Sequence, residues 1–142
     1  MKLSLVLSTH PAQFEAVALK GELEANLAKI AGWGYSGVEL AIRDPALVDG
    51  AILERWLSRY DLEVPAIGTG QAWGEEGLSF TSADPEVRAA AVERIQSHVP
   101  LAARLVAVII IGLIRGITAE GRTHDASMAA FADAMGRCAE VA

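Results

Sequence analysis

Four side chains with useful chemistry lie in or after segments whose hydrophobicity is typical of strands: His10, Glu39, Trp73 and Arg115. Glu39 can accept hydrogen bonds from hydroxyl groups, and His10 can bind a substrate or a metal. The indole of Trp73 can pack against C–H groups, and the guanidinium of Arg115 can hold a phosphate or carboxylate through two parallel hydrogen bonds. We predict that these four residues bind a polar small molecule.

Each of these residues also has a structural interpretation. Glu39 can pair with a nearby arginine or with backbone amides, His10 can cap a turn, and Trp73 can anchor its own loop. Arg115 can form a salt bridge with Glu39 or Glu120. Three histidines and scattered carboxylates show no spacing typical of metal ligands, so we predict no metal site in this chain. That no catalytic residue is expected here is implied only by the family resemblance described below.

Four hydrophobic segments predict the strands that position these side chains. Leu105–Ile111 is an unbroken β-branched run, which indicates a central parallel strand covered on both faces. It is too short for a transmembrane helix, which needs about 20 residues. The other predicted strands are Lys2–Leu7, Tyr35–Leu40 and Leu62–Ile67. Ligands of parallel α/β sheets bind where such strands end.

Amphipathic segments after these strands predict four helices, which begin near residues 22, 50, 85 and 126. Asp84 and Pro85 are typical of a helix start. Pro100 predicts a kink or break near His98. The glycine-rich stretch Gly68–Gly77 predicts a long loop, and the long exit after the first strand, Ser8 to Lys20, predicts a functional loop or a short extra helix.

This order of elements predicts an α/β fold with parallel strands in one domain, residues 1–142. An eightfold (β/α) barrel takes about 250 residues, so four strand–helix units fit half of such a barrel. A dinucleotide-binding sheet would show Gly-x-Gly-x-x-Gly after its first strand, where this chain has Ser8-Thr9-His10-Pro11.

The composition argues against polyanionic partners. The net charge is −6 and the pI is near 5.0, so we expect neither nucleic-acid nor membrane binding. Cys138 is the one cysteine and lies on a predicted apolar helix stripe, which favours an inert buried thiol and suits a cytoplasmic location.

Three segments resemble a known family: Gly34–Leu40 at the second strand, Ser82–Arg88 at the third helix, and Leu101–Gly112 at the fourth strand. They resemble the sugar phosphate isomerase/epimerase family with a xylose isomerase-like TIM barrel. This family includes hydroxypyruvate isomerases, ketose 3-epimerases and inosose dehydratases, and it is related to endonuclease IV. The resemblance covers nearly the whole chain but only the first half of the family's barrel. Val106 stands where the family often has glycine.

The resemblance implies the amino-terminal part of a sugar or sugar phosphate isomerase or epimerase. In that family a divalent metal (Mn, Mg, Zn or Co) is held by two glutamates, an aspartate and a histidine from strands five to eight, and the glutamates move a proton through an enediolate. This chain would lack those ligands, bind no cofactor by itself and be inactive alone. Endonuclease activity would need histidines where this chain has Gly68-Thr69-Gly70 and Gly112-Leu113.

A half barrel has open sheet edges, so we expect it to associate with something that covers them, such as a second copy in a homo-dimer. The alternative function is therefore a non-catalytic half-barrel module that self-associates and retains a site for a sugar or a phosphate.

Overall fold

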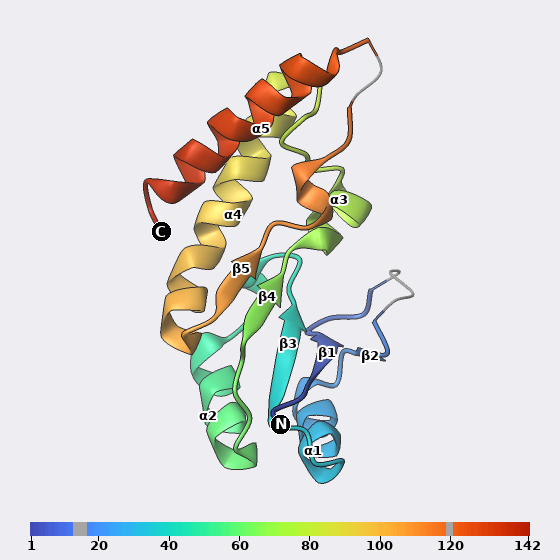
Figure 1. Cartoon of the computed structure of the whole chain (residues 1–142). Coiled ribbons are helices and arrows are strands. Elements are labelled where there is room, and N and C mark those ends of the chain that lie inside the picture. The colour runs from blue at the N-terminus through green and yellow to red at the C-terminus, as the bar shows by residue number, and fades with distance from the viewer. Residues whose placement is uncertain (13–16, 119–120) are drawn as a thin grey trace.

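The computed structural model describes residues 1–12, 17–118 and 121–142. In these residues the protein is a parallel five-stranded sheet with the strand order β2-β1-β3-β4-β5 (Figure 1). The strands are β1 (Ser4–Ser8), β2 (Leu19–Lys20), β3 (Gly37–Ala41), β4 (Ala66–Gly68) and β5 (Val108–Ile110). The helices are α1 (Leu23–Gly32), α2 (Gly50–Tyr60), α3 (Gly70–Glu76), α4 (Pro85–Leu105) and α5 (His124–Ala139), with short 3-10 helices η1 (Pro45–Leu47) and η2 (Leu113–Arg115).

The parallel α/β architecture of alternating strands and helices is confirmed. All four strand pairs in the sheet are parallel, as the alternation of elements predicted. The helix starts are also close to the predicted positions because their caps are local signals. The Asp84 side chain accepts a hydrogen bond from the Glu86 amide at the start of α4, and Thr123 caps α5 in the same way through the Ala126 amide.

One layer of helices covers one face of the sheet. Leu7, Leu40 and Ile67 from three neighbouring strands are fully buried in a core with Leu27 of α1 and Leu53 of α2. A second core lies between α4, α5 and the segment around Phe80, whose ring centroid is 6.3 Å from that of Phe131.

The prediction of a loop over Gly68–Gly77 is wrong, because most of this segment is helix α3. Gly77 ends this helix in the left-handed conformation at φ 71°. Ala72 is fully buried, and α3 packs against η2. Tertiary burial therefore outweighs the low helix propensity of Gly70 and Gly74.

Of the kink or break predicted near His98, the break is not found, since α4 is one helix from Pro85 to Leu105. Pro100 lies on the exposed side, while the flanking His98 and Leu101 are buried. Their packing holds the helix together across the one lost backbone hydrogen bond.

The segment after β1 ends in a two-residue strand that the sequence did not predict, Leu19–Lys20. Strand β2 pairs with the outer edge of β1, with Leu19 beside Leu7 and Lys20 beside Ser8. Part of the predicted loop, residues 13–16, lies outside the described residues.

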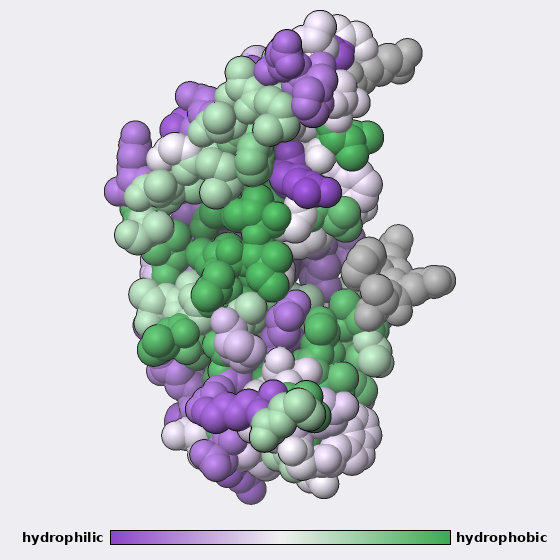
Figure 2. Space-filling view, viewed as in Figure 1, coloured by the Kyte–Doolittle hydropathy of each residue, from purple (hydrophilic) through white to green (hydrophobic). Residues whose placement is uncertain are grey.

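The prediction that both faces of the last strand are covered is wrong. Val106, Val108 and Ile110 are 91%, 67% and 38% exposed, whereas Ile109 packs against the core. Figure 2 shows apolar side chains gathered over β5. Helices cover only one face of this sheet. The apolar residues on the other face of β5 occupy positions that would point into the interior of a closed barrel.

Candidate functional site

The sheet has one face that the helices do not cover, which we call the open face. Successive residues of a strand point to opposite faces, so the neighbours of the buried Leu7, Leu40 and Ile67 lie on this side. Strand register places them in two rows: Val6, Glu39, Ala66 and Val108, followed toward the strand ends by Ser8, Ala41, Gly68 and Ile110.

Glu39 lies in the middle of the open face. Its neighbours in the row, Val6 and Ala66, are apolar, and the side chain is partly buried. A Cβ added to Gly68 would lie 3.7 Å from the Glu39 Oε1, so the carboxylate extends toward the row nearer the strand ends. Among the described residues, none pairs with this carboxylate. It therefore retains its capacity to accept hydrogen bonds from a ligand.

A polar bridge crosses the same face at the ends of the strands. The Nε2 of Gln71, in α3, donates to the Ser8 Oγ at 2.8 Å, and that hydroxyl donates to the His10 carbonyl at 2.7 Å. Beside it, the Thr69 hydroxyl donates to the Ile110 carbonyl at 2.9 Å. All three side chains that donate here are buried, so their positions are held by these bonds.

His10 lies on the other side of the strand ends. Its Nδ1 is 3.0 Å from the Thr9 Oγ1, and it lines a pocket of about 210 Å³ with residues of α1 and α2, including Leu23 and Trp56. The structure therefore separates the His10 imidazole from Glu39, although the His10 backbone contributes to the polar bridge.

Trp73 and Arg115 lie on the neighbouring elements α3 and η2. Trp73 is half-buried. Arg115 is exposed and lines a pocket of about 410 Å³ with His124 and Phe131 of α5. Among the described residues no salt bridge joins Arg115 to Glu39, and Glu120, the other suggested partner, lies outside them.

An ion-pair network fixes the position of α3 over the strand ends. Arg43, which follows β3, contacts Glu75 at 2.9 Å and Glu76 at 3.2 Å. Arg94 of α4 joins the network through Glu76 at 2.9 Å and Asp44 at 3.5 Å. Because several charges share these contacts, the network restrains α3 and thereby the Gln71 side chain.

His98 and Cys138 are structural groups, as the sequence predicted for the thiol. The His98 Nδ1 is 2.7 Å from the Arg94 carbonyl and its Nε2 is 3.1 Å from the Ile42 carbonyl. Burial lowers the pKa of His98, and the two carbonyls partly oppose this shift. Burial raises the pKa of the Cys138 thiol, which keeps it protonated.

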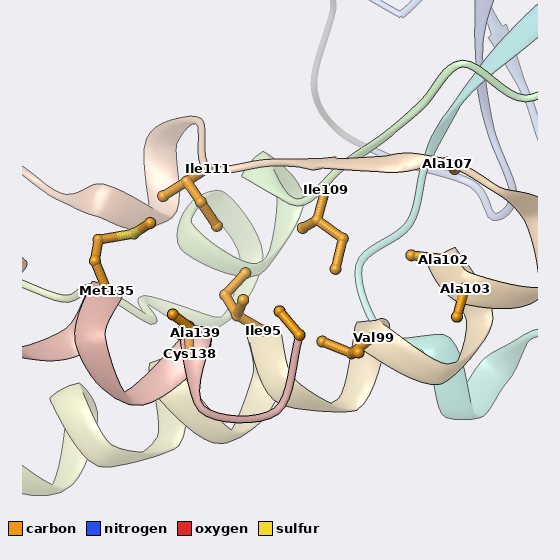
Figure 3. Close-up of a pocket in the computed structure, with 11 residues that line it drawn as sticks. Ile95, Val99, Ala102, Ala103, Ala107, Ile109, Ile111, Met135, Cys138 and Ala139 are labelled. Atoms are coloured by element: carbon orange, nitrogen blue, oxygen red, sulfur yellow. The ribbon is translucent and has the colours of Figure 1, made fainter.

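An apolar groove of about 410 Å³ lies between α4, β5 and the end of α5 (Figure 3). Ile95, Ile109, Ile111 and Met135 line it, and no charged side chain does. Its lining is mostly apolar and has no charged, hydroxyl or amide side chain to orient a hydrophilic ligand, unlike the open face.

The described residues do not form a metal centre. In the ranges 1–12, 17–118 and 121–142 no three His, Cys, Asp or Glu side chains come together as ligands of one ion would. The residues present there do not fit the family's metal.

A parallel sheet with helices on one face, an uncovered opposite face and polar groups at the strand ends defines part of a (β/α) barrel. The chain matches the model of the xylose isomerase-like TIM barrel family over residues 27–142. It therefore belongs to that family, as the resemblance of its sequence segments predicted.

Solved structures share this fold. D-allulose 3-epimerase from Methylomonas sp., crystallised with D-allulose, matches with a TM-score of 0.65 and 21% identity over 99% of this chain and 47% of its own. A 3-keto-D-glucoside 4-epimerase from E. coli matches with a TM-score of 0.69 and 12% identity, over 99% of this chain and 52% of its own. A family 2 AP endonuclease from Brucella melitensis matches with a TM-score of 0.65 and 18% identity, over 99% of this chain and 50% of its own.

The chain thus spans about half the length of these solved structures. A search of curated proteins finds no significant match. Within the described ranges no helix is both long and apolar enough to cross a bilayer.

Sequence reasoning missed two side chains that the structure places at the strand ends, Gln71 and Arg43. Both follow the ends of strands, which was the criterion that selected Glu39 and Arg115. The sequence around Gln71 is rich in glycine and predicts a loop, so it does not indicate the helix that carries Gln71.

Proposed function

We propose that this chain supplies the amino-terminal, substrate-orienting part of an isomerase or epimerase that acts on a sugar or sugar phosphate. Its family membership and the sugar epimerases among the similar structures support the class of reaction. The observation on which the proposal depends most is Glu39, a carboxylate without a partner among the described residues and with apolar neighbours in its row of the open face.

Glu39 would accept a hydrogen bond from a sugar hydroxyl. A carboxylate among apolar neighbours loses hydration, and a ligand hydroxyl would compensate for that loss. Arg115 would hold a phosphate or carboxylate, and Trp73 and His10 would border the ligand in the complete barrel. Arg115 and His10 line different pockets, so in this proposal they contact different parts of a ligand or belong to loops that adjust on binding.

For the whole barrel the proposal includes a divalent metal and an enediolate intermediate. The acids that move the proton would come from outside these residues, and no step is assigned to this chain. We further propose a cytoplasmic location, based on the single reduced thiol.

Binding of D-allulose and other ketoses to the chain, followed by saturation-transfer NMR, tests the proposal. Wild-type protein should show saturation transfer, and Glu39→Gln should weaken binding about tenfold or more, because a hydrogen bond to a charged group contributes about 1.5–3 kcal/mol. Glu63→Gln is the matched control, since Glu63 pairs with Lys2 at the opposite end of the sheet. Equal binding by the two variants would contradict the role of Glu39. Turnover by the chain with manganese and ketoses would contradict the placement of the acids outside it.

The exposed apolar residues of β5 favour a second function, self-association. Val108 and Ile110 lie on the open face of the end strand, and such an edge is a template for pairing. We propose a homo-dimer, detected by light scattering after size-exclusion chromatography. Val108→Lys should shift it to monomer, whereas Met128→Lys, at an exposed residue of α5, should not. A wild-type monomer at all concentrations would refute this proposal.

A further inference from the structure

The buried Gln71 is a polar group that the proposed function does not use. It is 6% exposed, and its partner Ser8 is fully buried. Burying an amide costs free energy, because its polar atoms lose their hydrogen bonds to water.

The Gln71 amide lies over the open face. Gln71 follows β4 and bonds to Ser8 on β1, and β3 lies between these strands. Neighbouring strands are about 4.8 Å apart, so the amide must extend above the end of β3 to reach Ser8. Ser8 belongs to the open-face row that includes Ala41, the last residue of β3.

Glu39 extends toward the same row. Its Oε1 would lie 3.7 Å from a Cβ on Gly68, which is in register with Ala41. Ala41 and Gly68 have little or no side chain, and among the described residues a Cβ on Gly68 would meet only the Glu39 Oε1 within 4 Å. Two polar groups from β3 and α3 therefore face one small region above the strand ends.

Gln71 forms fewer hydrogen bonds with the described residues than its amide group allows. Its Nε2 donates one bond to Ser8, which leaves a second N–H. Among the described residues, none donates a hydrogen bond to the Gln71 Oε1.

We propose that Gln71 is a specificity-determining residue that, together with Glu39, binds two neighbouring hydroxyls of the ligand. This inference rests on the proposed function, since the ligand is the sugar bound at Glu39. One hydroxyl donates to the Glu39 carboxylate, which only accepts. The adjacent hydroxyl accepts from the second N–H of Gln71 or donates to its Oε1. The ligand class is thus a vicinal diol of a ketose, and Ser8 holds the amide in the orientation that binding requires.

The test measures dissociation constants by NMR titration of the chain with D-allulose and with its monodeoxy analogues. Gln71→Met keeps the shape of the side chain and removes its polar atoms. It should weaken binding of D-allulose about three- to tenfold, the effect of one neutral hydrogen bond. The analogue that lacks the contacted hydroxyl should bind wild type and Gln71→Met equally.

The matched control is Gln96→Met. The Nε2 of Gln96 also donates one hydrogen bond, to the Arg137 carbonyl, but Gln96 lies in α4 on the helix side of the sheet. This variant should bind every ligand as wild type does. If Gln71→Met does not fold, Gln71→Asn replaces it, because the shorter amide cannot reach Ser8 and the ligand together.

The outcomes separate the two proposals. If wild type binds no ketose, the proposed function and the role of Gln71 both fail. If wild type binds D-allulose and Gln71→Met binds it equally well, the role of Gln71 alone fails. The role also fails if Gln71→Met weakens D-allulose and every deoxy analogue by the same factor, since that pattern would reflect a change of shape.

Discussion

Replacement of Val106 by glycine should stabilise the protein. Val106 follows the last residue of α4 with φ 53° and ψ 38°, a left-handed conformation that is unfavourable for a β-branched residue. The conformation is required, because the amides of Val106 and Ala107 bond back to carbonyls in the last turn of α4. Val106 is 91% exposed, so its side chain contributes little packing that could be lost.

The expected gain follows from two opposing contributions. A left-handed L-residue costs roughly 1–2 kcal/mol, which glycine removes. Glycine also gives the unfolded chain more freedom, which costs roughly 0.5–1 kcal/mol. Val106→Gly should therefore raise the free energy of unfolding by about 1 kcal/mol, which for a chain of this size raises Tm by about 3 °C.

Urea unfolding followed by circular dichroism measures this gain. Val106→Ala keeps the Cβ and should gain less than half as much. Ala103→Gly, at an exposed position inside the last turn of α4, should lose about 0.5–1 kcal/mol, which separates relief of strain from a general effect of glycine. A loss of stability in Val106→Gly, or an equal gain in Val106→Ala, would refute the reasoning.

Three further changes follow from the same structure. Gly116→Ala should reduce the free energy of unfolding by more than about 2 kcal/mol, because its backbone has φ 83° and a Cβ would overlap the Ser79 hydroxyl; a calorimetric Tm close to that of wild type would contradict this. Asp84→Ala should cost about 1 kcal/mol by removing the cap of α4, and Asp84→Asn, which retains an acceptor, should cost clearly less in the same urea assay. Because burial lowers the pKa of His98, the unfolded chain binds its proton more readily, so stability should be complete above about pH 6.5 and fall as the pH drops below that value. Urea midpoints between pH 7.5 and 5.5 measure that slope, which His98→Gln should reduce; an unchanged slope would assign the pH dependence to other groups.

Local signals predicted most of the fold. The cap at Asp84 acts within a few residues, so the start of α4 could be placed from sequence. The alternation of apolar strands and amphipathic helices was sufficient to predict the parallel sheet.

Long-range contacts explain what was missed. Helix α3 depends on Ala72 packing against other elements, which its glycines do not reveal. An unbroken run such as Val106–Ile111 has the same composition whether its second face is covered or open, so the exposed side of β5 was not predictable.

The site was predictable only in part. Glu39 stands out as a carboxylate within an apolar segment, and the structure places it on the open face. The bridge from Gln71 to Ser8 joins residues that are 63 positions apart, and only the folded chain brings them together.

The two edges of the sheet differ, because β2 pairs with part of β1 at one edge, whereas β5 forms the other edge. Leu19 and Lys20 of β2 already pair with Leu7 and Ser8 of β1, whereas no described strand pairs with the outer edge of β5. In the proposed dimer, association would therefore occur at the β5 edge. Association at one edge alone stops at a symmetric pair, while association at both edges would continue into rings or filaments.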